Sequence, residues 1–170
     1  FSFWQTDAVP EVIDAMEQLP VDGTPLGLYL HIPFCRKRCH FCYFRVYTDK
    51  DSAAIKNYLD ATLAELEIYA RKPFIGGRTP RFVYFGGGTP SYLSTKQLRH
   101  LTDGMKALLP WDAVEEVTFE CEPGTLTDAK LKIIREVGVT RLSLGVENFD
   151  DHILEINGRA HRGGEIDRAY

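Results

Sequence analysis

The chain has 170 residues, of which 44% are hydrophobic, and this is enough apolar material for one domain with a buried core. A formal net charge of −4 gives no reason to expect nucleic acid as the main partner. We also expect no membrane span, because no apolar run is long enough to cross a bilayer, and no secretory signal is visible.

Residues 1–25 are predicted to form a lead-in segment. A short helix is expected from Pro10 to Leu19, because proline suits the first turn and apolar side chains recur on one face, at Val12, Ile13, Met16 and Leu19. A turn is expected over residues 20–25, which contain Asp22-Gly23. The chain opens without methionine and stops inside a further predicted helix, so we expect it to be part of a longer protein.

From Leu26 onward, a unit of apolar strand, loop and amphipathic helix repeats four times. The expected strands cover residues 26–32, 81–85, 116–121 and 140–146. The expected helices run from Asp51 or Ser52 to Arg71, onward from Ser94-Thr95, from Thr127 to Val137, and from Asp150 or Asp151 to beyond Ile156.

This alternation predicts an α/β fold with parallel strands, in which residues 26–170 form about four units of a partial (β/α) barrel. Functional residues of such folds gather at the carboxyl ends of the strands. A barrel that is not closed leaves an unpaired edge at residues 140–146, so we expect residues 1–170 alone to be poorly soluble or inactive.

Three cysteines follow the first predicted strand on one short loop, as Cys35-x3-Cys39-x2-Cys42. Three thiols so close together suit a metal site in a reducing compartment, the cytoplasm, better than disulfides. An iron–sulfur cluster normally takes four cysteines, so three indicate a cluster with one iron open to a ligand that is not protein. A structural zinc and free thiols are the alternatives. Cys121 lies far away and is expected to be a buried strand residue.

Other polar and glycine residues follow the remaining strands. Three glycines in Gly86–Pro90 would let the backbone approach a ligand closely. Glu120 and Glu147 end the third and fourth strands, where a carboxylate is costly unless it is paired. The basic run Arg36-Lys37-Arg38 either lowers the thiolate pKa values or is a solvated loop, and both interpretations stay open. His40 is expected to face solvent.

The cysteine spacing, with Phe41 just before the third cysteine, resembles the signature of radical S-adenosylmethionine (SAM) enzymes. The longer string His31-Ile-Pro-Phe-Cys35 resembles one branch, the oxygen-independent coproporphyrinogen III oxidase (HemN-like) family. The resemblance implies that the cysteines hold a [4Fe-4S] cluster whose open iron chelates SAM. It also implies that an electron from the cluster cleaves SAM, and that the 5′-deoxyadenosyl radical abstracts hydrogen from a tetrapyrrole.

The resemblance further implies the residues that contact SAM. The glycine segment would hold the methionyl amino group, Phe41 would lie beside the adenine, and Arg159 would reach the carboxylate through its guanidinium fork. Glu147 stands where the oxidase carries glutamine. The full set of implied contacts is Tyr29, Phe41, Gly87, Gly88, Thr89, Glu120, Glu147 and Arg159.

The sequence indicates the cofactors more specifically than it indicates the reaction. The oxidase pattern adds a cysteine two residues after the third, and this chain has Phe44 there. Cys42-Tyr-Phe44 looks more like the chaperone and diverged branches. We therefore expect a radical SAM oxidoreductase acting on a tetrapyrrole, with a heme chaperone and a methylase or cyclase of another small molecule as the alternatives. An electron donor such as a flavodoxin or ferredoxin would be the partner.

Overall fold

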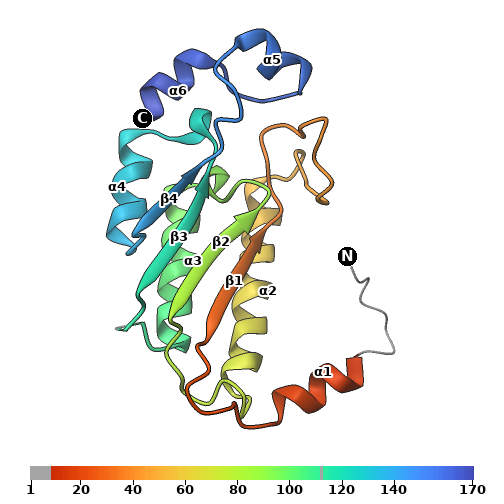
Figure 1. Cartoon of the computed structure of the whole chain (residues 1–170), viewed down its shortest axis with the longest axis vertical. Coiled ribbons are helices and arrows are strands. Elements are labelled where there is room, and N and C mark those ends of the chain that lie inside the picture. Colours follow the sequence, from red (N-terminus) through yellow and green to blue (C-terminus); the bar gives the residue numbers. More distant parts are fainter. Residues whose placement is uncertain (1–8, 112) are drawn as a thin grey trace.

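A single four-stranded sheet organises the chain in the computed structural model, which describes residues 9–111 and 113–170. Its strands are β1 (Gly27–Ile32), β2 (Phe82–Gly87), β3 (Glu116–Cys121) and β4 (Arg141–Leu144). They pair in parallel and in chain order, β1-β2-β3-β4 (Figure 1). The predicted α/β class and the parallel pairing are therefore confirmed.

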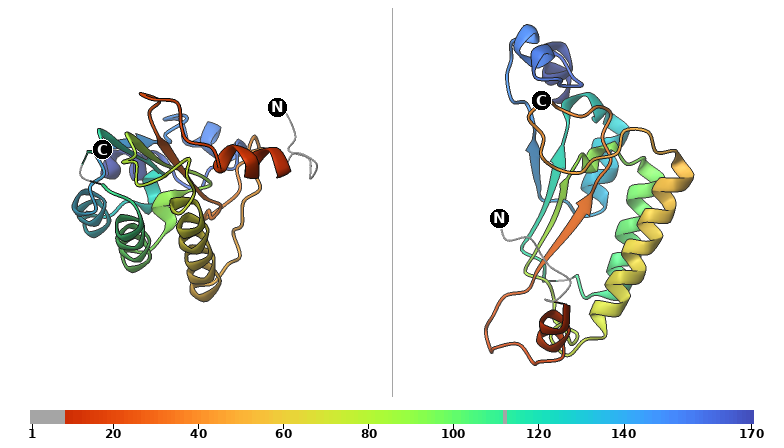
Figure 2. Two further views of the ribbon diagram at one scale, coloured as in Figure 1. Left: turned by 90° about the horizontal axis from the view of Figure 1, so that it is seen from below. Right: turned by 90° about the vertical axis from the view of Figure 1, so that its right-hand side faces the viewer.

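Three helices cover one face of this sheet and leave the other face open (Figure 2). They are α2 (Ser52–Ala70), α3 (Thr95–Leu108) and α4 (Asp128–Glu136). Each begins at a residue whose side chain accepts a backbone N–H of the first turn, namely Asp51, Ser94 and Thr127. These caps follow directly from local sequence, which is why the helix starts were predictable.

The hydrophobic core lies between the sheet and these helices. Alternate strand residues such as Ile32, Val83 and Phe119 are almost completely buried, and the Phe85 and Phe119 rings pack with centroids 5.3 Å apart. The intervening residues lie on the open face, and Tyr29, at 55% exposed, is one of them.

Short helices gather beyond the carboxyl ends of the strands, while the first helix lies at the opposite end of the sheet (Figure 1). The former are η2 (Pro90–Tyr92), η3 (Pro123–Thr125), α5 (Asp151–Ile156) and α6 (Gly163–Ala169); the latter is α1 (Val9–Met16). None of the helices in the described part of the chain is both long and apolar enough to cross a membrane.

Two predicted helix ends were wrong. The first helix ends at Met16, not Leu19, because Leu19 precedes Pro20 and a residue in that position disfavours the helical conformation. The last expected helix does not continue beyond Ile156, because Gly158 takes a left-handed conformation with φ of 70°. A separate helix, α6, begins five residues after Gly158. The division into residues 1–25 and 26–170 stays a prediction.

Candidate functional site

The loop that carries the three cysteines leaves the end of β1 and is fixed by backbone hydrogen bonds. The Cys35 N–H donates to the Tyr47 carbonyl at 3.0 Å, and the Tyr47 N–H donates to the Pro33 carbonyl at 2.8 Å. Cys35 is buried, at 8% exposed, and Cys39 and Cys42 are half-buried. The structure brings all three thiols to the wall of one cavity of about 220 Å³, the cysteine cavity, together with Phe41, Gly87, Gly88, Thr89, Glu147 and Arg159.

The glycine segment, residues 86–90, packs against this loop. Gly87 has φ of 108°, which favours glycine, and the Gly88 N–H donates to the Ile32 carbonyl at 2.8 Å. A Cβ on Gly88 would lie 2.9 Å from Cys35 Sγ. The Thr89 hydroxyl donates to the same sulfur at 3.3 Å. Glycine at position 88 is therefore required for β2 to end beside Cys35.

Arg159 reaches the cysteine loop from the segment after α5. Its Nη1 donates to Cys39 Sγ at 3.2 Å, and its Nη2 donates to the Gly145 carbonyl at 2.6 Å. Within the described residues, Arg159 Nε is buried and has no hydrogen-bond partner. Burial raises the pKa of the Cys35 thiol, while the Thr89 hydrogen bond and the Arg159 charge act in the opposite direction.

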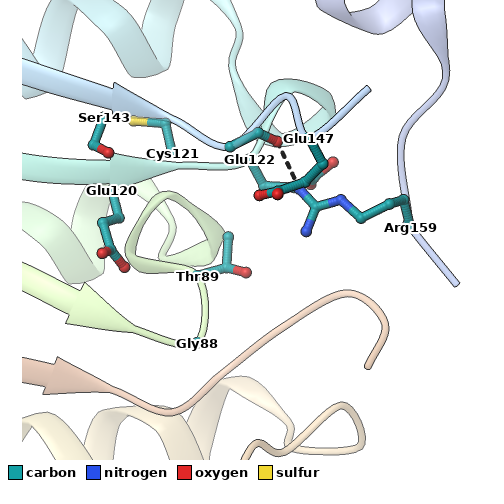
Figure 3. A pocket seen from close by; sticks show the side chains of 9 residues that line it. Gly88, Thr89, Glu120, Cys121, Glu122, Ser143, Glu147 and Arg159 are labelled. Atoms are coloured by element: carbon teal, nitrogen blue, oxygen red, sulfur yellow. Dashed lines mark hydrogen bonds between the residues drawn. The ribbon is translucent and has the colours of Figure 1, made fainter. Parts of the chain in front are cut away.

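Figure 3 shows the residues that line a second cavity of about 210 Å³, the carboxylate cavity. Both cavities are lined by Gly88, Thr89, Glu122, Glu147 and Arg159. Glu120 lines only the second, and in Figure 3 it lies on the other side of Thr89 from Arg159.

Glu147 is held in an unusual backbone conformation. It has φ of 65°, and no other described residue except glycine has a positive φ. This conformation costs free energy for a residue with a Cβ, and it occurs where the chain leaves β4 for α5.

Tyr29 lies apart from both cavities. Its hydroxyl is 3.0 Å from His31 Nδ1, and its ring stacks on Tyr84 with centroids 6.1 Å apart. The Tyr84 hydroxyl in turn donates to Glu120 Oε1 at 2.7 Å, and this hydrogen bond raises the pKa of Tyr84 to about 12. Tyr29 is therefore connected to the carboxylate cavity only indirectly, through its contact with Tyr84 and the hydrogen bond from Tyr84 to Glu120.

Sequence reasoning missed a buried pair at the end of β3. Glu122 and His161 are 8% and 0% exposed, and Glu122 Oε1 lies 3.1 Å from His161 Nδ1. Sequence analysis assigned neither residue a function. The available signals were a second carboxylate two residues after Glu120 and a histidine two residues after Arg159.

The basic run is divided among different roles. Arg36 pairs with Glu122 at 3.0 Å, and Arg38 Nη2 donates to the Cys42 carbonyl at 3.1 Å, so neither is simply solvated. His40 is exposed, as expected, yet its Nδ1 lies 2.8 Å from the Ile156 carbonyl. Cys121 is buried, as expected, and burial raises its pKa to about 12.

The described residues contain no group of three or more histidine, cysteine, aspartate and glutamate side chains placed to hold a single metal ion. The three thiols instead line a cavity without meeting at one point. None of the three forms a disulfide.

The chain resembles known proteins in sequence and in fold. A family profile described as Radical SAM superfamily matches residues 29–170. The chain is 36% identical over 148 residues to the Heme chaperone HemW of Escherichia coli and 39% identical over 139 residues to the Heme chaperone HemW of Bacillus subtilis. It is 34% identical over 146 residues to the Oxygen-independent coproporphyrinogen III oxidase of Cereibacter sphaeroides.

These alignments cover 85%, 81% and 86% of this chain, but only 38%, 36% and 32% of the relatives. The chain thus spans about a third of the length of these proteins. A solved structure of coproporphyrinogen III oxidase (HemN) from Escherichia coli, described as a Radical SAM enzyme, superposes with a TM-score of 0.71 at 31% identity. That superposition covers 85% of this chain and 33% of the other.

Proposed function

The chain belongs to the Radical SAM superfamily, and on that premise we propose that residues 26–170 hold a [4Fe-4S] cluster and SAM for a reaction on a tetrapyrrole. Cys35, Cys39 and Cys42 would bind the cluster. When bound, the cluster and SAM supply one-electron cleavage of the sulfonium and abstraction of a hydrogen atom from the substrate. The protein's own residues bind, orient and shield these groups.

The observation that carries this proposal is the meeting of three thiols and a partly unsatisfied guanidinium at one cavity. A buried donor without a partner, here Arg159 Nε among the described residues, is costly and marks a place where an acceptor belongs. A carboxylate is the acceptor that suits a guanidinium fork best. The donor set therefore fits an amino acid cofactor beside a metal cluster.

The glycine segment supports the same assignment. Gly88 lines both cavities, and only a residue without Cβ leaves room there beside Cys35. We propose that the backbone of Gly87, Gly88 and Thr89 binds the methionyl amino group, and that Glu147 contacts SAM from the opposite wall. Phe41, which is 55% exposed and lines the cysteine cavity, would lie beside the adenine.

Glu120 and Tyr29 have weaker support. Glu120 lines the carboxylate cavity, so it would contact SAM there, while its hydrogen bond to Tyr84 holds the carboxylate in place. Tyr29 lines neither cavity, and a direct contact with the cofactor would require its exposed ring to turn toward the strand ends. We therefore propose that Tyr29 contacts SAM from the open face of the sheet and not from the wall of either cavity.

A cluster also suits the thiols better than structural zinc does. Zinc needs its ligands within about 2.0–2.3 Å of one point, and structural sites usually have four of them. The loop offers three thiols along a cavity wall, and Cys121 is held on β3 by a hydrogen bond to the Phe119 carbonyl. Each cysteine of a cluster binds a different iron, so its sulfurs need not converge.

The oxidase reaction is our main proposal, with the heme chaperone as the second candidate. A solved structure that superposes on this chain is that of a coproporphyrinogen III oxidase. The second candidate is favoured by two of the relatives, which are named heme chaperones, and by Phe44 in place of a fourth cysteine. We further propose a flavodoxin or ferredoxin as electron donor and the cytoplasm as compartment, because the thiols require reducing conditions.

The test uses the full-length protein, reconstituted without oxygen and reduced in the presence of SAM. Iron per chain and 5′-deoxyadenosine are measured, with and without coproporphyrinogen or heme. Cys39→Ser should lose most of the iron, whereas Cys121→Ala, the matched control, should retain it. Arg159→Lys should keep the iron and weaken SAM binding about tenfold or more, because lysine lacks the fork.

The outcomes separate the candidate functions. Deoxyadenosine that rises with coproporphyrinogen, together with loss of carboxyl groups, supports the oxidase. Tight heme binding without SAM cleavage supports the chaperone. Cleavage that neither compound stimulates favours a methylase or cyclase, and a protein that binds neither iron nor SAM contradicts the proposal altogether.

A further inference from the structure

A cluster of three polar side chains, of which Glu122 and His161 are buried and Arg36 is exposed, joins the cysteine loop to the segment that carries Arg159. Its centre is the Glu122 carboxylate, which accepts hydrogen bonds from Arg36 Nε and Nη2, both at 3.0 Å. Glu122 Oε1 also lies 3.1 Å from His161 Nδ1. Arg36 directly follows Cys35, and His161 lies two residues after Arg159. We call the three residues Arg36, Glu122 and His161 the Glu122 bridge.

The carboxylate is contacted mainly by groups of the protein itself. An ionised glutamate has about four lone-pair sites, two on each oxygen. Oε1 accepts from Arg36 Nη2 and from the Gly124 N–H at 3.1 Å and also lies against His161 Nδ1, while Oε2 accepts from Arg36 Nε. Although Glu122 lines both cavities, most of its hydrogen-bonding capacity is therefore used within the protein. This points to a role in holding other residues and not in binding SAM.

Arg36 lies between two carboxylates. Burial alone would lower the pKa of Arg36, but the hydrogen bond and charge of Glu122, with a smaller effect of Glu165, raise it above its ordinary value. Glu165 on α6 offers Arg36 a second carboxylate at 3.3 Å. A bidentate guanidinium–carboxylate pair fixes both partners in orientation as well as in distance.

His161 extends the connection to the end of β4. The ring is fully buried, and its Nε2 lies 3.1 Å from the Val146 carbonyl. Val146 precedes Glu147, the residue with the left-handed backbone. The bridge thus touches the chain beside a proposed cluster ligand, beside Arg159 and beside Glu147, and the first of these is far in sequence from the other two.

From this arrangement we infer that Glu122 is a positioning residue. It holds the cysteine loop and the Arg159 segment at a fixed separation, so that the cluster half and the SAM half of the site form one rigid unit. The inference rests on the proposed function for the identity of the two halves. Glu122, His161 and Arg36 together hold the two segments in place, and none of them does so alone.

The first test is a double-mutant cycle on SAM affinity in the full-length, reconstituted protein. Arg36→Gln and His161→Gln break the bridge at opposite ends. Each should weaken SAM binding tenfold to a hundredfold, as is typical when residues behind metal ligands are changed. Because both changes break the same connection, the double variant should be about as weak as the weaker single variant. Lys96→Gln is the matched control, since Lys96 is exposed, lines neither cavity and loses the same single charge as Arg36→Gln. Its affinity should stay within twofold of the parent.

The second test needs neither cofactor. Hydrogen exchange of the unloaded protein is measured over residues 35–42 and 157–162. Arg36→Gln should accelerate exchange in residues 157–162, and His161→Gln should accelerate it in residues 35–42. The two segments also meet directly, because the His40 N–H donates to the Asn157 carbonyl at 3.0 Å, so the variant that assigns the coupling to the bridge is Glu122→Gln. It should accelerate exchange in both segments, while Lys96→Gln, at an exposed site on α3, should change neither.

Multiplicative losses of affinity in the cycle, or exchange that changes only on the mutated side, would overturn the inference. A failure of the proposed function gives a different pattern. In that case the parent protein itself binds no iron or SAM, and the exchange measurement alone decides whether Glu122 couples the two segments.

Discussion

Replacing Gly88 by alanine tests how the end of β2 shapes the site. A Cβ at this position would lie 2.9 Å from Cys35 Sγ, 2.9 Å from the Ile32 carbonyl oxygen and 3.0 Å from the Phe34 carbonyl oxygen. Two of these neighbours are backbone atoms of the β1 end, and Cys35 is buried, so none can move without shifting the cysteine loop.

The expected cost follows from overpacking. One extra methyl group in a closely packed region destabilises a protein by about 1–3 kcal/mol, and three contacts of this kind place Gly88→Ala toward the upper end. Because Cys35 must move away, the variant should also bind less iron after reconstitution. Urea unfolding of the unloaded protein measures the first effect, and iron per chain measures the second.

Gly164→Ala is the matched control. Gly164 lies in α6, and its Cβ would meet only Arg168 Nη1, at 3.8 Å. Alanine in a helix is favoured over glycine by about 0.5–1 kcal/mol, so this variant should unfold at the same or a higher urea concentration and keep its iron. If Gly88→Ala matches the parent in both stability and iron, the close approach of Gly88 to Cys35 does not constrain the site.

Three further predictions concern residues around the two cavities. Glu120→Gln removes the hydrogen-bonded charge that raises the Tyr84 pKa to about 12, so tyrosinate absorbance, compared with Tyr84→Phe, should show Tyr84 titrating nearer 10.0. The raised pKa of Tyr84 stabilises the folded state below pH 10, and this contribution is lost as the pH rises toward 12. The difference in the free energy of unfolding between Glu120→Gln and the parent should therefore shrink over that range, and a constant difference would contradict this. Lys130→Met should lower the free energy of unfolding by about 1–3 kcal/mol, because buried Lys130 Nζ donates to the Ser91 carbonyl at 2.9 Å; no change in urea unfolding would refute it. Glu147→Gly should leave stability equal or raise it by about 1 kcal/mol, since glycine tolerates φ of 65°, yet weaken SAM binding in equilibrium dialysis; a clear loss of stability would argue against backbone strain.

Much of the fold was predictable because its signals are local. Asp51, Ser94 and Thr127 each cap a helix through a hydrogen bond to a residue three positions later, so the cap and its target lie within one short stretch of sequence. Apolar runs that alternate with such helices imply parallel pairing. Parallel pairing in turn places the strand ends together, which is why the cysteines and the glycine segment were both expected at the carboxyl ends of the strands.

The helix ends were less predictable, because each depends on one residue's backbone. Leu19 fits the apolar stripe of the first helix, but the following Pro20 removes it from the helix. Gly158, in turn, could either continue or end a helix, and its left-handed conformation ends it.

The sequence by itself therefore determined the order of the elements, the three thiols and the glycine segment, since each depends on neighbours along the chain. Only the tertiary structure decided that Tyr29 lies outside both cavities and that Glu122 pairs with Arg36, 86 residues away, and His161, 39 residues away. Such partners are set by strand register and by how the loops pack over the strand ends. The residue pattern of one segment does not indicate which hydrogen-bond donor a distant segment will place beside it.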